Sequence, residues 1–89
     1  MGQVGVKIKI MPESPDTDLE AIQIGAKTEI EAQQGILNNY EEDPIAFGLK
    51  ALIATITFPE EKDSEILVEI FKKQQGVSSV EVIDYRRLL

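Results

Sequence analysis

The side chains that could carry chemistry in this sequence are carboxylates, because it contains no histidine and no cysteine. Zinc sites built from those residues, thiolate nucleophiles and imidazole bases are therefore excluded. The densest carboxylate group is the run Glu41, Glu42 and Asp43. Consecutive side chains in a turn diverge, and no neighbour is placed to separate their pKa values, as acid and base catalysis requires. We interpret the run as a solvated acidic turn and predict that the chain is not an enzyme.

The sequence contains no recognisable motif for binding a metal ion or a nucleotide. Asp16 and Asp18 alternate as in a calcium loop, but the other ligands and the glycine of that motif are missing, so helix capping explains them better. The six glycines show no phosphate-binding spacing; they are Gly2, Gly5, Gly25, Gly35, Gly48 and Gly76. We therefore expect no metal and no cofactor.

Two features remain that a structural role explains incompletely. Phe47 follows Pro44 in the string PIAFG, where a loop enters a strand. It either packs into the core, as a Phe entering a central strand does, or anchors in the pocket of a partner. The chain ends with Tyr85, Arg86, Arg87, Leu88 and Leu89. This end is either a frayed tail or a cationic segment whose arginines bind carboxylates or phosphates of another molecule.

Length and composition limit the class of protein. Eighty-nine residues form one domain, 1–89, and a hydrophobic content of 43% is enough for one core. The net charge of -7 argues against direct binding to nucleic acid. The longest apolar run, 51–56, is too short to cross a bilayer, and the N-terminus does not resemble a signal peptide. We expect a cytoplasmic protein that is monomeric when free.

The first half of the chain predicts a strand, a helix and a weaker strand. Alternating apolar residues from Gln3 to Ile10 indicate a half-buried strand. A helix should begin near Asp16 or Thr17 and end at Gly35, with an apolar stripe on one side. The stripe consists of Leu19, Ile22, Ala26 and Ile30, with Gln23 among the polar positions. Residues 36–42 have poor strand propensity, which favours a place at a sheet edge.

The second half repeats the pattern. The stretch 47–58 has apolar residues on both parities, typical of a central strand that is partly covered on each side. The residues Ile66, Leu67, Ile70 and Phe71 form a second helical stripe that Gly76 ends. Residues 77–85 alternate again and predict a fourth strand.

The order β-α-β-β-α-β with right-handed crossovers leads to an α+β, ferredoxin-like fold, a four-stranded antiparallel sheet with both helices on one face. The first and third strands are central, and the second and fourth lie at the edges. The turn near Phe47 then lies at one end of the sheet, and the C-terminus lies at the other. A strand over 47–58 spans about 35 Å at ~3.4 Å per residue, so a target touched by both features is bridged between two separate regions.

Three strings resemble the archaeal type of the translation elongation factor 1-beta family: MPESPD at 11–16, PIAFGL at 44–49 and GVSSVEVIDYRRLL at 76–89. The resemblance covers the whole chain, and the strings occur in the right order and spacing. It implies the ferredoxin-like fold and a guanine nucleotide exchange factor, which promotes GDP release from elongation factor 1-alpha so that GTP can rebind. The longer eukaryotic proteins carry an N-terminal extension, and we expect only the exchange domain here.

The resemblance also implies where the partner binds. In the eukaryotic relatives, a Phe in the same Pro-Ile-x-Phe-Gly motif packs into a pocket on the partner's second domain, and Phe47 matches it. Those relatives use a penultimate Lys to disturb the magnesium and phosphate region of the GTPase domain. Here the penultimate residue is Leu88, so the sequence departs from the family, and which arginine acts stays open. The expected partner-binding residues are Pro44, Phe47, Arg86, Arg87, Leu88 and Leu89.

Two other classes of function compete with exchange. A ferredoxin-like chain could be a small-ligand or protein-interaction module without exchange activity, which would show a defined pocket and dimerise through the free sheet face. An acylphosphatase-like enzyme would need an anion-binding loop after the first strand. The string PESPD at that place is acidic and contains two prolines, which argues against such a loop.

Overall fold

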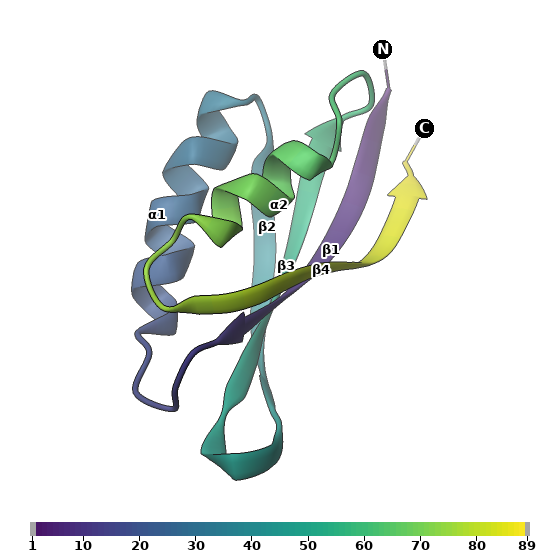
Figure 1. Cartoon of the computed structure of the whole chain (residues 1–89). Coiled ribbons are helices and arrows are strands. Elements are labelled where there is room, and N and C mark those ends of the chain that lie inside the picture. The colour runs from purple at the N-terminus through teal and green to yellow at the C-terminus, as the bar shows by residue number, and fades with distance from the viewer. Residues whose placement is uncertain (1, 89) are drawn as a thin grey trace.

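The structure is a computed structural model that describes residues 2–88. A four-stranded antiparallel sheet carries two helices on one face (Figure 1). The elements are β1 (Gln3–Pro12), α1 (Leu19–Ala32), β2 (Ile36–Pro44), a short 3₁₀ turn (Ala46–Gly48), β3 (Lys50–Pro59), α2 (Glu65–Lys72) and β4 (Val77–Arg87). This confirms the predicted ferredoxin-like α+β fold.

The strand order is β2-β3-β1-β4, and every neighbouring pair is antiparallel. The central places of β1 and β3 and the edge places of β2 and β4 are as predicted. Side chains alternate across β1, and every second one is buried against the helices. The residues of β1 that belong to the core are Val4, Val6, Ile8 and Ile10, each exposing 1% or less.

The core lies between the sheet and the two helices. The predicted stripe of α1 buries Ile22, Ala26 and Ile30, and α2 buries Leu67 and Phe71 beside them. Burying a side chain of the size of Leu or Phe contributes about 1.5–3 kcal/mol. One polar position differs from the expectation, because Gln23 is also buried.

Helix α1 begins later than predicted. Asp18 is its N-cap, and the Asp18 Oδ1 accepts a hydrogen bond of 3.1 Å from the backbone N–H of Ala21. The start predicted near Asp16 or Thr17 is wrong because these residues belong to a turn, in which Thr17 N–H donates to the carbonyl of Ser14. The N-cap residue directly precedes the first helical residue, so a cap at Asp18 places the start of the helix at Leu19.

The strand boundaries also differ from the prediction by a few residues, and two of these differences matter for the site. Strand β3 begins at Lys50, because Phe47 and Gly48 adopt left-handed backbone conformations that turn the chain before the strand. Strand β4 continues to Arg87, two residues further than predicted. β1 offers pairing partners that far, since Arg86 pairs with Gly5 and Arg87 with Val4.

The molecule is elongated along the strands, with principal extents of 42 × 21 × 18 Å. The turn between β2 and β3 lies at one end of the sheet, where Pro44 pairs with Lys50. The end of β4 lies at the other, where Val4 pairs with Arg87, and Figure 1 shows both chain termini on that side. The predicted separation of Phe47 from Arg87 is therefore confirmed. Within residues 2–88, neither helix is long and apolar enough to cross a membrane.

Candidate functional site

The aromatic pole is the turn over residues 45–49 that joins β2 to β3. Two backbone hydrogen bonds close it, from Ile45 N–H to the carbonyl of Leu49 at 2.8 Å and from Leu49 N–H to the carbonyl of Ala46 at 3.2 Å. Phe47 has φ 62° and ψ 29°, and Gly48 follows with φ 76°. The left-handed conformation costs a residue with a side chain about 1–2 kcal/mol. This short turn therefore holds a strained residue at its tip.

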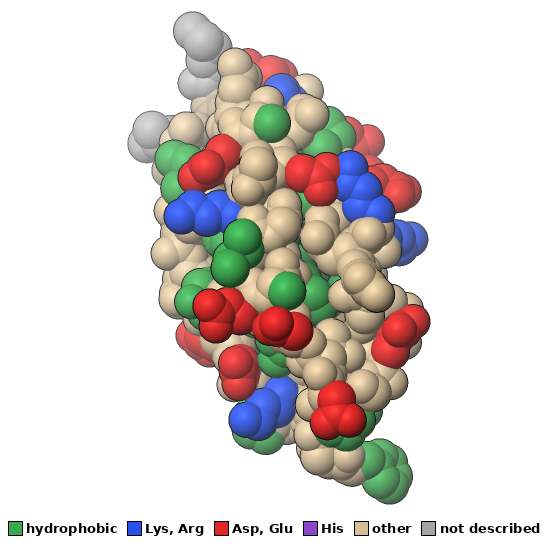
Figure 2. Space-filling model, turned by 90° about the vertical axis from the view of Figure 1, so that its left-hand side faces the viewer, with side chains coloured by type: hydrophobic (Ala, Val, Ile, Leu, Met, Phe, Trp, Pro, Cys, Tyr) green, Lys and Arg blue, Asp and Glu red, His purple; other side chains and the backbone are tan. Residues whose placement is uncertain are grey.

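The Phe47 side chain is 93% exposed. The interpretation that Phe47 packs into the core is therefore wrong, because the residue belongs to the turn and not to β3. Figure 2 shows hydrophobic atoms projecting from the lower end of the molecule, the end at which Figure 1 places the β2–β3 turn. An aromatic ring has much apolar area to bury, and strain at a tip is typical of a functional site. The geometry suits insertion into a pocket of another protein.

The acidic run beside this turn lies in a strand and not in a turn. Glu41, Glu42 and Asp43 belong to the edge strand β2, so their side chains alternate between the two faces of the sheet. Glu42 forms an exposed ion pair of 3.6 Å with Lys50 across the β2–β3 ladder. No group of three metal-ligating side chains occurs among residues 2–88.

The C-terminal pole consists of Arg86, Arg87 and Leu88. The arginines belong to the ordered end of β4, so the frayed-tail interpretation is wrong for residues 86–88. Arg86 pairs with Gly5, whose position faces the open side of the sheet. Arg87 pairs with Val4, whose side chain is buried on the helix side. Successive residues of a strand point to opposite faces, so the two guanidinium groups leave the strand on different sides.

Each arginine has a carboxylate partner within the chain. Arg86 Nε lies 2.9 Å from Asp84 Oδ2, and Arg87 Nη2 contacts Glu60 Oε1 in the loop after β3. Both arginine side chains keep at least 70% of their surface exposed, so a partner molecule can still reach them. Sequence reasoning missed these carboxylates. The spacing of Asp84 and Arg86 on one strand face could have indicated the first pair, whereas the pairing with Glu60 depends on the fold.

Leu88 ends the described part of the pole. Its backbone N–H donates a hydrogen bond of 2.9 Å to the carbonyl of Gln3, and its side chain is 49% exposed. Leu89 was also predicted to bind the partner and lies outside the described residues. Pro44, which was predicted at the other pole, ends β2 opposite Lys50. The structure thus divides those predicted binding residues that it describes between the two ends of the sheet.

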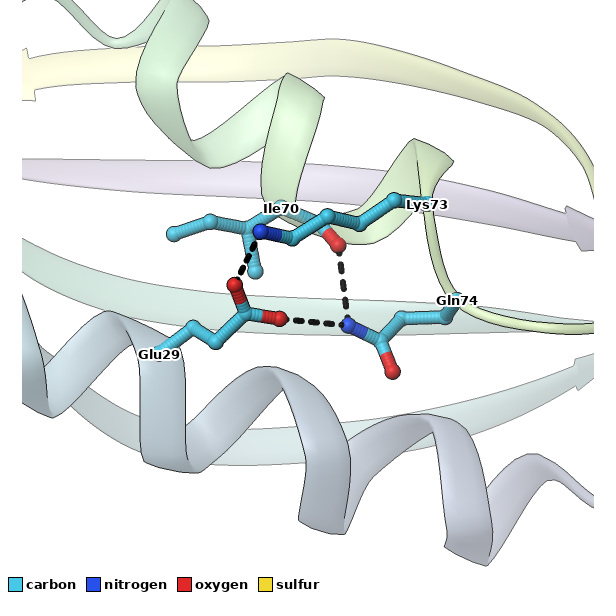
Figure 3. Close-up of polar contacts among 4 residues, drawn as sticks. All are labelled: Glu29, Ile70, Lys73 and Gln74. Carbon is cyan, nitrogen blue, oxygen red and sulfur yellow. Dashed lines mark hydrogen bonds and ion pairs between the residues drawn. The ribbon is translucent and has the colours of Figure 1, made fainter.

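A cluster of polar side chains connects α1 to the end of α2, away from both poles (Figure 3). Glu29 of α1 accepts a hydrogen bond of 3.0 Å from the amide of Gln74 and pairs with the ammonium of Lys73. The Gln74 amide also donates to the carbonyl of Ile70. The hydrogen bond from Lys73 holds the pKa of Glu29 below its usual value. A hollow of about 420 Å³ lies beside this cluster, between α1 and α2. We interpret the cluster as a link between the helices.

Comparison with known proteins links the whole chain to one family. Residues 5–88 match the family described as the EF-1 guanine nucleotide exchange domain. The chain is 48% identical to elongation factor 1-beta of Methanosarcina barkeri, over 99% of this chain and 100% of that protein. It is 43% identical to elongation factor 1-beta of Methanobrevibacter smithii, over the full length of both proteins. A similar protein from Methanothermobacter thermautotrophicus is 44% identical, also over both full lengths.

Proposed function

Because the chain belongs to the EF-1 guanine nucleotide exchange domain family, we propose that it binds its GTPase at two poles and accelerates GDP release by binding alone. The chain is a guanine nucleotide exchange factor of translation elongation. Its proposed partner is elongation factor 1-alpha. The observation that carries the two-pole mechanism is the placement of an exposed aromatic ring and two exposed arginines at opposite ends of one rigid sheet.

Exchange needs no bond to be made or broken by the factor. Bound GDP is retained by contacts to its phosphates, to magnesium and to the surrounding loops. A protein that binds the form with weakened contacts more tightly shifts the population toward release. The chain acts in this way without being an enzyme, which is compatible with a composition that lacks histidine and cysteine.

We assign the anchoring half of the mechanism to the aromatic pole. The ring of Phe47 is exposed and is presented by a turn that two hydrogen bonds close. A preformed turn loses little conformational entropy on binding, and a buried aromatic anchor contributes about 2 kcal/mol or more to an interface. Phe47 therefore supplies affinity for the partner's distal domain.

We assign the releasing half to the C-terminal pole. The guanidinium groups of Arg86 and Arg87 are cationic donors that pair with phosphates or carboxylates. Their intramolecular partners Asp84 and Glu60 hold them without covering them. When Phe47 is anchored, this pole reaches the magnesium and phosphate region, where a cation competes for the groups that retain GDP.

The remaining parts of the proposal concern the state of the free protein. We propose that residues 1–89 act as one exchange domain, as a monomer in the cytoplasm, where elongation takes place. We also propose no direct contact with nucleic acid, because a net charge of -7 repels a phosphate backbone.

A fluorescent-GDP release assay on the cognate elongation factor 1-alpha tests the two halves separately. The variants are Phe47→Ala and the double substitution Arg86→Gln with Arg87→Gln, which removes the charges but keeps the strand. A variant without residues 86–89 completes the set. Phe47→Ala should raise the concentration needed for half-maximal acceleration. The arginine variant and the truncation should lower the GDP release rate even at saturating protein.

Matched controls lie away from both poles. Ile24→Ala removes an apolar side chain that is 61% exposed in α1, and Lys72→Gln removes a cation from α2. Both should leave release unchanged. Full release rates with the arginine variant and the truncation at saturation would remove the releasing half of the mechanism. Unaltered half-saturation with Phe47→Ala would remove the anchoring half.

A further inference from the structure

The last residues of β4 are set off from the rest of the strand by a β-bulge. The register between β1 and β4 shifts between Lys7 and Ile8, so Ile83 is an extra residue between Val82 and Asp84. Such a bulge bends a strand, and Figure 1 shows β4 curving away in its C-terminal part. Beyond the bulge, four residues pair with residues 4–7 of β1. This short segment carries both arginines of the C-terminal pole.

None of the side chains of this segment is fully buried. Tyr85, Arg86, Arg87 and Leu88 are exposed, and Asp84 is half-buried. An edge strand near a chain end has one neighbour only, and such ends fray unless they are fastened. Beyond the ladder, the Arg87–Glu60 ion pair and the contacts of Leu88 fasten this segment to the rest of the chain. Exposed ion pairs stabilise by about 1 kcal/mol at most, so the contacts of Leu88 matter.

Leu88 folds onto the open face of the sheet above Gly5. A β-carbon at position 5 would lie 3.3 Å from Leu88 Cδ2 and 3.8 Å from Leu88 Cγ. The φ of Gly5 lies outside the left-handed region, so the backbone there does not require a glycine. The missing side chain instead leaves room for Leu88. A hollow of about 250 Å³ lies at this place, and its lining includes Gly5, Leu88, Lys7, Thr55, Asp84 and Arg86.

We propose that Gly5 is a positioning residue for exchange, because it provides the seat on which Leu88 latches the arginine-bearing end of β4. The proposal rests on the proposed function of the C-terminal pole. When a larger side chain at position 5 fills this seat, the Leu88 side chain moves off the sheet. The last pairs between β1 and β4 then open. Arg86 and Arg87 then sample many positions, and fewer molecules present them to the partner in the active arrangement.

The substitution Gly5→Val separates this role from a general effect on folding. Valine has a higher strand propensity than glycine, so the thermal stability of the chain should stay equal or rise. The GDP release rate at saturating protein should nevertheless fall several-fold. Leu88→Ala should lower the same rate, because it removes the latch. With the combined variant Gly5→Val and Leu88→Ala, GDP release should be no slower than with Leu88→Ala alone. Filling the space above Gly5 has no further effect when the Leu88 side chain is already removed.

Amide hydrogen exchange supplies a second measurement. In Gly5→Val and in Leu88→Ala, the amides of Arg86 and Leu88 should exchange faster than in the wild type, while those of Ile8 and Ile10 stay protected. Lys9→Ala, on the same open face further along β1, is the matched control and should change neither readout. An unchanged release rate with Gly5→Val, or losses that multiply in the combined variant, would overturn the latch. Failure of the proposed function looks different, because the wild-type chain would then not accelerate GDP release.

Discussion

Phe47 combines two properties that folding alone does not favour, a left-handed backbone and an apolar ring exposed to water. A glycine adopts this backbone without the steric cost, and Gly48 beside it does so. Folding stability alone would therefore favour a second glycine at position 47. We therefore propose that Phe at this position serves a contact with the partner, which the free chain lacks.

Replacing Phe47 by glycine should therefore affect folding stability and partner affinity in different ways. We expect Phe47→Gly to leave the free energy of unfolding unchanged or to raise it by up to about 1 kcal/mol, because the strain is relieved. Affinity for the GTPase should fall by about 2 kcal/mol or more, as with Phe47→Ala. Urea denaturation and titration of the partner measure the two quantities. Retained affinity with Phe47→Gly would show that the ring is not an anchor.

At the scale of elements, the junction between α1 and β2 depends on close packing at Gly35. Gln34 takes the left-handed conformation that ends the helix, with φ 71°, and Gly35 N–H donates to the carbonyl of Ile30. A β-carbon on Gly35 would lie 2.8 Å from both Ile30 Cγ2 and Phe58 Cδ1, in fully buried side chains. The glycine is thus required by space between the helix and the sheet.

Gly35→Ala should destabilise the fold by about 1–3 kcal/mol, the usual effect of overpacking a core. Gly25→Ala is the matched comparison, because the atoms nearest to a β-carbon there belong to the end of the Gln74 side chain, which can shift. It also gains about 1 kcal/mol of helix propensity, so it should cost less than Gly35→Ala. Chemical denaturation of both variants gives the two values. The opposite order would contradict the packing argument.

The contact between α1 and α2 should respond to pH through Glu29. Its pKa is lowered in the folded chain, so its contribution to stability is present above the ordinary Glu pKa of about 4.3 and is lost as the pH falls through the folded value. Glu29→Gln should therefore be less stable than the wild type at neutral pH, and the difference should shrink on acidification. Denaturation of both proteins at neutral pH and at a pH below the Glu29 pKa measures the difference in stability. Lys27→Gln, on the same helix, is the control, and a difference that persists in acid would exclude the charge as its cause.

At the scale of the whole molecule, the proposed mechanism makes the sheet a spacer between two partner contacts. The poles lie at opposite ends of a body 42 Å long and share no contact among the residues described. Changes at sites this far apart are additive to within about 0.5 kcal/mol. A single domain can therefore anchor and release through separate surfaces.

The combined variant with Phe47→Ala, Arg86→Gln and Arg87→Gln tests this separation. Its loss of affinity should equal the sum of the losses from the two poles to within about 0.5 kcal/mol. Equilibrium titration of the GTPase with the three proteins gives the comparison. A combined loss far from the sum would mean that the poles are coupled, and the spacer model would fail.

The sequence by itself determined the order of elements, the strand positions and the two candidate ends. Alternation along β1 and the spacing of Ile22, Ala26 and Ile30 are local patterns, and local patterns report which face of an element is buried. It also placed Phe47 and the arginines at opposite ends, because strand direction follows from the order of connections.

Only the tertiary structure decided what those ends look like. The exposure of Phe47 depends on a left-handed turn, and the ordering of Arg86 and Arg87 depends on β1 offering partners as far as Val4. The seat of Leu88 on Gly5 and the pairing of Arg87 with Glu60 join residues far apart in the chain. Such contacts arise only when the strands are placed side by side, so no local pattern contains them.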